Sequence, residues 1–149
     1  FTVLKEAGLR MASAPGTYDD SAFSVLCPSA CRLKLAFDLG SKSFWPAPRV
    51  TSSVVRMERR RDPVAADDRA GFSAFVRALF SSRRKTLRNN LRASAPALGP
   101  SLGHGDGASL DTALVETFER LGIRADIRAE ALRPEELAAL FRALHGPIG

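Results

Sequence analysis

The chain has 149 residues, of which 45% are hydrophobic and 26% are charged, and its formal net charge is +6. This composition suits one sizeable core or two small subdomains and excludes a disordered chain as the first interpretation. No apolar stretch approaches the length of a membrane span and the first residues lack a signal-peptide pattern, so we expect a cytoplasmic protein with no membrane partner.

The first third of the chain predicts two short helices. Leu4, Ala7, Gly8 and Met11 have helical spacing from the outset, which indicates a helix already under way and a chain that is a piece of a longer protein. After a turn at 14–17, Asp19, Asp20 and Ser21 can cap a helix over 22–27. Residues 24–26 fit a strand equally well.

Two strands are expected next. Residues 32–39 alternate almost strictly, with Leu33, Leu35, Phe37 and Leu39 on one face, which predicts a half-buried strand. Residues 50–57 are rich in β-branched side chains and predict a second strand. The turn-rich residues 40–48 lie between them, so we expect an antiparallel pair joined by a long loop.

A polar, proline-marked segment at 62–68 separates the strands from a region with helical periodicity alone. We expect four helices there, over 70–80, 83–93, 108–121 and 134–144, the last ending at Gly146. Their inward positions are Phe72, Phe75, Val76, Leu79, Phe80, Leu87, Leu91, Leu110, Leu114, Phe118, Leu121, Leu137, Leu140, Phe141 and Leu144. The glycine-rich residues 103–107 follow prolines rather than a buried strand, so we interpret them as linker and not as a nucleotide turn.

Positive charge is concentrated in one run. Residues 69–105 hold seven basic residues and no acid, with Arg83, Arg84 and Lys85 at the centre. In the helix expected over 83–93, Arg84, Arg88 and Arg92 recur every fourth residue and would form one stripe. Cations at a helix start oppose the macrodipole, so a phosphate-bearing partner explains the run better than local stability does. The alternative is a solvated arginine-rich face.

The two cysteines, Cys27 and Cys31, have no histidine nearby in sequence. Structural zinc normally takes four ligands, so we interpret both as ordinary thiols and expect no metal and no disulfide framework.

Three blocks of the chain carry a family resemblance. Residues 44–55 read FWPAPRVTSSVV, residues 80–91 read FSSRRKTLRNNL, and residues 128–132 read RAEAL. In sequence, order and spacing they resemble the ribosomal RNA adenine dimethyltransferases. With the weaker likeness of residues 5–25, the resemblance covers essentially the whole chain.

The resemblance implies an S-adenosylmethionine-dependent enzyme that dimethylates adenines of small-subunit ribosomal RNA, an rRNA adenine N6-methyltransferase. It implies an α+β fragment in which the last strands of a Rossmann-like methyltransferase sheet (1–61) and a linker (62–68) precede a small all-helical RNA-binding domain (69–149). The family's adenosyl loop and catalytic motif would precede residue 1, so we expect no cofactor-binding residue here and a chain that is inactive alone.

The resemblance also assigns site residues. Phe44 matches the family's target-pocket aromatic, and its ring would stack on an extruded adenine, with Pro46 and Pro48 stiffening the loop. The alternative is that Phe44 and Trp45 cover the edge of the sheet. The residues expected to bind RNA are Arg83, Arg84, Lys85, Arg88 and Arg92. Arg128 and Glu130 are expected to form a charge pair within the helical domain, without a chemical role.

The expected partners are ribosomal RNA and the small ribosomal subunit, and the expected oligomeric state is a monomer. Two further functions stay open. One is a non-catalytic RNA-binding or ribosome-assembly module, and the other is a resistance methyltransferase acting on large-subunit ribosomal RNA.

Overall fold

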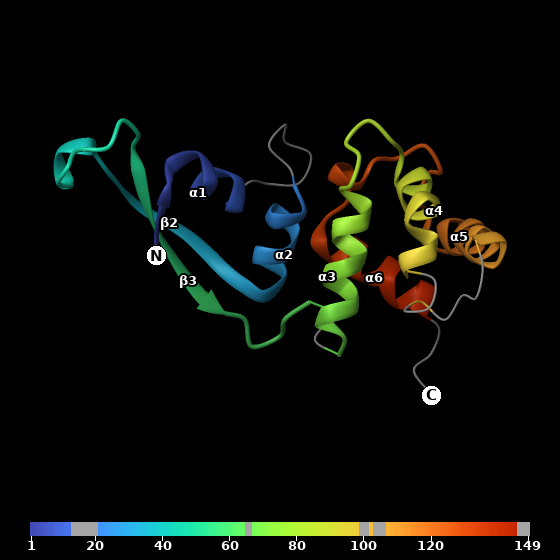
Figure 1. Ribbon diagram of the computed structural model, residues 1–149. Helices are drawn as coiled ribbons and strands as arrows, with labels where there is room; N and C mark the ends of the chain where they lie inside the picture. The colour runs from blue at the N-terminus through green and yellow to red at the C-terminus, as the bar shows by residue number, and fades with distance from the viewer. Residues whose placement is uncertain (13–20, 65–66, 99–101, 103–106, 146–149) are drawn as a thin grey trace. The chain divides into compact units, whose positions relative to one another are not determined.

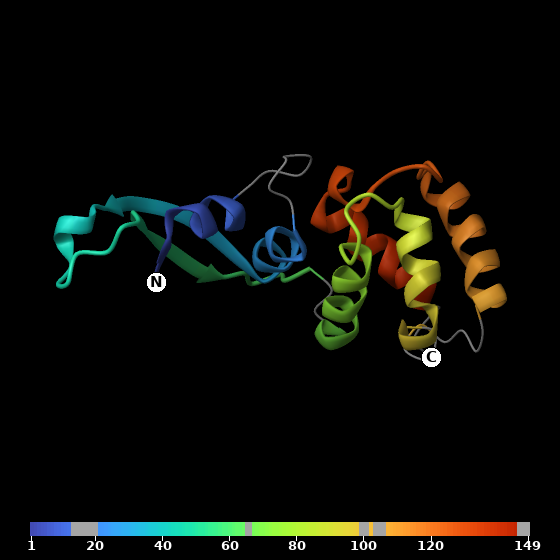
Figure 2. The ribbon, with the colours of Figure 1, turned by 45° about the horizontal axis from the view of Figure 1, so that its top comes forward.

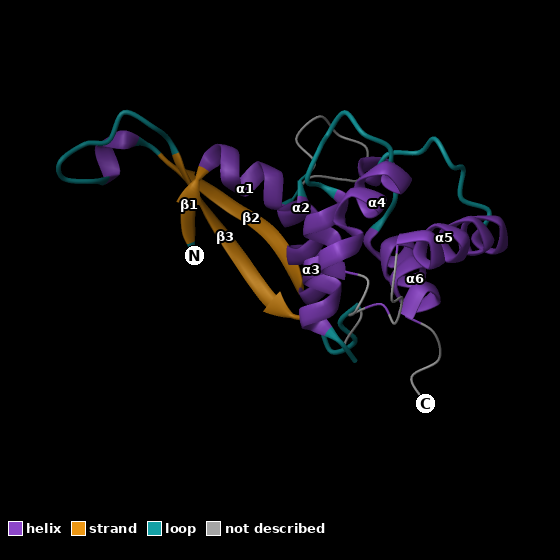
Figure 3. Ribbon diagram, turned by 45° about the vertical axis from the view of Figure 1, so that its right-hand side comes forward, coloured by secondary structure: helices purple, strands orange, loops and turns teal. Residues whose placement is uncertain are grey.

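The computed structural model describes residues 1–12, 21–64, 67–98, 102 and 107–145, and it divides into two compact units, Phe1–Pro63 and Val64–Gly149 (Figure 1). The predicted turn at 14–17, residues 103–106 and Gly146 lie outside the described residues. Within the described part of the chain, every strand belongs to the first unit, and the second unit is helical (Figure 3).

The first unit holds a three-stranded antiparallel sheet of order β1-β3-β2. β2 (Cys31–Leu39) and β3 (Ser52–Arg59) confirm the predicted antiparallel pair. β1 (Thr2–Leu4) was not expected, and the prediction of a helix that includes Leu4 is wrong there. The reason is long-range pairing: the Phe1 carbonyl accepts a hydrogen bond from the Val55 N–H at 2.8 Å, and the Phe1 amine donates to the Val55 carbonyl at 2.9 Å.

A β-bulge changes which side chains of β2 face the helices. Leu35 lies opposite Val55 whereas Phe37 lies opposite Val54, so Ala36 is an extra residue in the ladder. Because side chains alternate along a strand, this extra residue moves Phe37 to the other face of the sheet. Phe37 is 59% exposed, and the prediction that it shares a buried face with Leu35 is wrong.

Two helices cover one face of this sheet (Figure 2). α1 (Lys5–Met11) approaches it closely at Gly8, where an added Cβ would lie 3.1 Å from the Leu35 side chain and 3.3 Å from that of Val3. α2 (Ala22–Ala30) begins after Ser21, whose backbone N–H donates to the Ser24 hydroxyl at 2.9 Å. Residues 24–26 are therefore helical, and the strand alternative is wrong.

The described residues of the second unit form four helices, which pack around one apolar core. They are α3 (Arg69–Leu79), α4 (Leu87–Leu98), α5 (Gly107–Leu121) and α6 (Pro134–His145), and a short 3-10 turn, η3 (Ala129–Ala131), precedes α6. The predicted inward positions that are buried are Phe72, Phe75, Val76, Leu79, Leu87, Leu91, Leu110, Leu114, Phe118, Leu137, Leu140, Phe141 and Leu144. The Phe141 ring contacts the rings of Phe72 and Phe75, with centroids 5.7 and 5.4 Å apart, and so joins α6 to α3.

Two predicted inward positions lie at helix ends instead. Leu121 is 38% exposed because α5 ends there: Gly122 turns the chain with φ +65°, and the Ile123 N–H closes the turn on the Phe118 carbonyl. Phe80 is half-buried, since it follows the last residue of α3. α4 extends to Leu98, beyond its predicted end at residue 93.

Candidate nucleic-acid interface

Arg83, Arg84 and Lys85 lie in a turn before α4, which we call the basic turn, and not in the helix predicted over 83–93. All three side chains are exposed. The turn is closed by a hydrogen bond from the Lys85 N–H to the Ser82 carbonyl at 3.1 Å. The helix begins at Leu87, and the Thr86 hydroxyl accepts a hydrogen bond from the Asn89 N–H at 3.3 Å, so Thr86 caps the helix in place of Ser81 or Ser82.

Asn90 holds the basic turn against the helical core. Its side chain is only 2% exposed, and its amide donates to the Leu79 carbonyl at 2.7 Å and to the Ser82 carbonyl at 3.0 Å. Its amide oxygen accepts a hydrogen bond from the Ser81 hydroxyl at 3.4 Å. One buried side chain thus satisfies the backbone groups that end α3 and precede the three cations.

Sequence reasoning did not single out Asn90, although the sequence carries a signal. Asn90 falls three residues after Leu87 and one before Leu91, so it occupies the buried stripe of α4. A buried amide among leucines requires hydrogen-bond partners, and the nearest free backbone groups are those of the preceding turn.

Arg88 and Arg92 have a partner within the protein. Arg88 donates two hydrogen bonds to the Asp111 carboxylate of α5, at 3.0 and 2.9 Å, and the Arg92 Nε lies 3.6 Å from the same group. The hydrogen bonds from Arg88 lower the pKa of Asp111. The structure therefore groups Arg88 with Arg92 on Asp111, while Arg84 belongs to the basic turn, and the predicted single stripe is wrong because α4 starts only at Leu87.

The aromatic loop, residues 40–51 of the first unit, carries Phe44 and Trp45. It begins with the 3-10 turn η1 (Ser41–Ser43), and its far end is fixed by a hydrogen bond from the Lys5 N–H to the Thr51 carbonyl at 3.0 Å. Phe44 is 36% exposed and Trp45 is 97% exposed. A side chain so exposed covers nothing, so the alternative that Trp45 shields the edge of the sheet is wrong.

Other predicted features have simple outcomes. Arg128 and Glu130 form the expected pair, with 3.6 Å between Nη1 and Oε1. Cys27 and Cys31 are half-buried free thiols, and burial, aided by Cys31, raises the pKa of Cys27.

Among the described residues there is no group of three or more His, Cys, Asp or Glu side chains placed to hold a metal, and no helix there could span a membrane.

The described residues also lack the arrangement that a methyl-donor site requires. An adenosyl site of this kind uses a glycine-rich turn between a buried strand and the following helix. Here β1 passes directly into α1 at Lys5, without an intervening turn.

Comparison with solved structures identifies the fold. A crystal structure of a dimethyladenosine transferase from Plasmodium falciparum superposes with a TM-score of 0.78 at 18% identity, covering 93% of this chain and 54% of that one. The crystal structure of 23S rRNA methyltransferase ErmE gives a TM-score of 0.56 at 17% identity, covering 96% of this chain and 52% of that one. The chain thus shares its fold with about half of each of these two structures.

Sequence comparison gives the family. The family model described as ribosomal RNA adenine dimethylase matches residues 1–98. Ribosomal RNA small subunit methyltransferase A of Rubrobacter xylanophilus is 39% identical over 144 residues, covering 97% of this chain and 48% of that protein. The protein of the same name from Myxococcus xanthus is 38% identical over 149 residues, with 99% and 48% covered. The chain belongs to the ribosomal RNA adenine dimethylase family, and it spans about half the length of these curated relatives.

Proposed function

We propose that this chain is the C-terminal part of an enzyme that uses S-adenosylmethionine to dimethylate adenines of small-subunit ribosomal RNA. The observation that carries the proposal is the family match over residues 1–98, which includes both the aromatic loop and the basic turn. The methyl donor binds to a portion of the enzyme that this chain does not contain. Residues 1–61 belong to the Rossmann-like catalytic domain, 62–68 form the linker, and 69–149 form the helical RNA-binding domain.

The basic turn binds RNA phosphates. Its support is the combination of three exposed cations with a rigid base, since Asn90 and Thr86 fix the backbone on either side. A turn that is already ordered loses little conformational entropy on binding. We assign the main contact to Arg83, Arg84 and Lys85 because all three are exposed in the turn, and Arg88 and Arg92, which share Asp111, contribute from the adjoining helix.

The aromatic loop holds the target adenine. An exocyclic amine inside a base stack cannot be reached, so the base must leave the stack, and an exposed ring offers a face on which it can rest. Stacking of this kind is worth about 1–3 kcal/mol per base, similar to the cost of unstacking. Phe44 serves as the stacking face, and the exposed Trp45 beside it is a second ring available to RNA.

RNA binding across a salt series tests the role of the basic turn. Arg83→Ala/Arg84→Ala/Lys85→Ala is expected to weaken binding of a ribosomal RNA hairpin and to reduce the slope of log K against log salt by about one for each phosphate that the variant no longer neutralises. A triple variant with the wild-type slope and affinity would exclude the turn as the RNA-binding segment.

The chain's one tryptophan reports on the aromatic loop. Stacking of adenine on this loop should quench Trp45 fluorescence when RNA with unpaired adenines is added, and Phe44→Ala should reduce the affinity by roughly 1–3 kcal/mol. Fully paired RNA is the control. In the whole enzyme, labelled methyl groups should pass to 30S and not to 50S particles, and the reverse result would favour large-subunit RNA as the substrate.

A further inference from the structure

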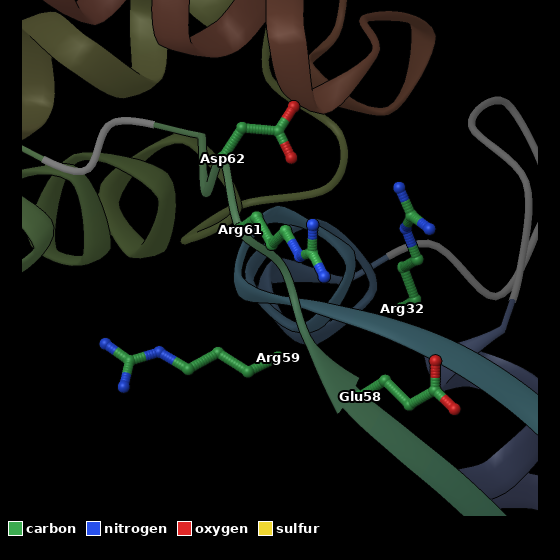
Figure 4. Close-up of a pocket in the computed structure, with 5 residues that line it drawn as sticks. All are labelled: Arg32, Glu58, Arg59, Arg61 and Asp62. Carbon is green, nitrogen blue, oxygen red and sulfur yellow. The ribbon is translucent and has the colours of Figure 1, made fainter.

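A second group of arginines lies in the first unit, apart from the residues already assigned to RNA. A pocket of about 390 Å³ is lined by Arg32 from the start of β2, Glu58 and Arg59 from the end of β3, and Arg61 and Asp62 from the residues that follow (Figure 4). All five side chains are exposed. We call this the cationic pocket.

Pairing within the sheet leaves the pocket with excess positive charge. Arg32 lies opposite Glu58 in the ladder, but the Glu58 carboxylate is held by Arg56, with 2.6 Å between Oε1 and Nη2. None of the three pocket arginines forms an ion pair with a carboxylate in the part of the chain that the structure describes. The residues that line the pocket carry three guanidinium groups and two carboxylates, and the Glu58 carboxylate is already paired with Arg56, which lies outside the lining.

Two of the arginines extend to the same side of the pocket. Arg32 lies opposite Glu58 and Arg59 lies opposite Cys31, so the side chains of Arg32 and Arg59 project from opposite faces of the sheet. Figure 4 shows the Arg59 side chain extending away from the other four, whereas the Arg61 side chain extends to the side on which Arg32 lies. Exposed guanidinium groups concentrated on one concave surface are suited to an anion with several acceptor oxygens, because each presents a planar fork of donors.

We propose that the cationic pocket is a second RNA-phosphate site, which binds the phosphodiester backbone through Arg32 and Arg61. The choice of RNA among polyanions rests on the function proposed above, whereas the anion-binding character of the pocket rests on its own geometry. The pocket belongs to the unit that carries the aromatic loop, so it gives that unit an electrostatic contact of its own with the substrate.

The test compares three variants of the 149-residue chain by fluorescence anisotropy of a labelled RNA hairpin over a range of KCl concentrations. The pocket variant is Arg32→Ala/Arg61→Ala. The matched control is Arg77→Ala/Arg142→Ala, which removes the same charge from exposed positions on α3 and α6. The third variant is the basic-turn triple substitution.

The pocket variant is expected to bind RNA several-fold more weakly than the control and to reduce the salt slope by about two, one for each arginine. A pocket variant that matches the control while the basic-turn variant loses binding overturns this inference alone. A basic-turn variant that matches wild type while the pocket variant loses binding overturns the proposed role of the turn and supports the pocket.

Two further arms complete the test. Arg32→Gln/Arg61→Gln keeps the side-chain stems and removes the charges, so it replaces the alanine variant if that one is less stable. Polyglutamate is the competitor that represents an acidic protein partner. If polyglutamate displaces RNA at equal charge concentration, and the pocket variant binds both RNA and polyglutamate more weakly, then the pocket is assigned to an acidic protein partner and not to RNA.

Discussion

At the scale of single residues, Asn90 links the fold to the proposed RNA contact. Asn90→Ala removes the amide that binds the Leu79 and Ser82 carbonyls and leaves both without that donor. We expect a decrease of about 1–3 kcal/mol in the free energy of unfolding, measured by urea denaturation. We also expect weaker RNA binding with an unchanged salt slope, because the charges remain while the turn loses its support.

Asn89→Ala is the matched control for this prediction. Asn89 is the neighbouring residue on α4, but it is exposed. Its replacement should leave both stability and RNA affinity close to wild type. Equal effects of the two substitutions would show that Asn90 has no special role in holding the basic turn.

Asp111 gives a prediction on pH. Its pKa lies below the ordinary value of 3.8 because Arg88 donates two hydrogen bonds to the carboxylate. The folded state therefore releases this proton more readily than the unfolded state, so the stabilisation is present above the ordinary pKa and is lost as pH falls through the lowered one. Asp111→Asn should make the free energy of unfolding less dependent on pH below about 4.

Urea denaturation over a pH series checks this, with Glu116→Gln, an exposed carboxylate on the same helix, as the control. An Asp111 variant with the wild-type pH profile would contradict the prediction. The same variant releases Arg88 and Arg92 from their shared carboxylate, so its RNA affinity should rise if these arginines contact phosphates.

At the scale of elements, the start of α4 decides where the three cations lie. Thr86→Ala removes the hydroxyl that accepts from the Asn89 N–H, and helix caps of this kind contribute about 0.5–2 kcal/mol. Thermal unfolding should show a lower midpoint for Thr86→Ala. Thr86→Ser keeps the hydroxyl and should stay near wild type, and an equal decrease in both variants would exclude the cap as the cause.

Sequence patterns predicted the elements whose stability is local or whose apolar spacing is regular. The stripe of Phe72, Phe75, Val76 and Leu79 predicted α3 because the buried face of a helix requires apolar residues three and four positions apart. The start of α4 could not be found in the same way. Two serines and three helix-compatible cations precede it, and they form a turn because of the hydrogen bonds of the Asn90 side chain, the Thr86 cap and the bond from the Lys85 N–H to the Ser82 carbonyl.

The sheet shows the same limit. Alternation predicted β2, but the bulge at Ala36 depends on pairing with β3 and reverses the faces beyond it. As a result, Asp38 faces the helices, where it accepts hydrogen bonds from Ser53 and Lys5, both at 2.6 Å. β1 has three residues and exists through its partner strand, so its own sequence carried too little pattern to predict it.

The basic turn was predicted as a site segment from its residue types, and the aromatic loop was predicted from the family resemblance at Phe44. The cationic pocket was not, since its residues come from positions 32 and 58–62, which only the β2–β3 register brings together. Functional side chains that lie in one short segment can be recognised from the sequence. A site assembled from two strands can be recognised only when the register of the strands is known.

At the scale of the whole molecule, the two units differ in how completely they bury their apolar side chains. The second unit encloses a large core of leucine and phenylalanine, with Phe75, Leu87 and Leu114 fully buried. Most of the large exposed apolar side chains among the described residues lie in the first unit. They are Phe1, Leu4, Leu9, Phe23, Phe37, Phe44, Trp45 and Val50. Burial of apolar surface is the main favourable contribution to folding, so stability should reside chiefly in the second unit.

We therefore expect residues 64–149, produced alone, to unfold cooperatively with a helical circular dichroism spectrum and to retain the RNA binding of the basic turn. Phe75→Ala should destabilise this piece by about 3–5 kcal/mol, because it removes a large ring from the centre of the core. Residues 1–63 alone should show no cooperative transition, since their exposed apolar side chains leave too little buried surface to offset the loss of chain entropy. A cooperative transition in residues 1–63, with none in 64–149, would reverse this assignment of stability.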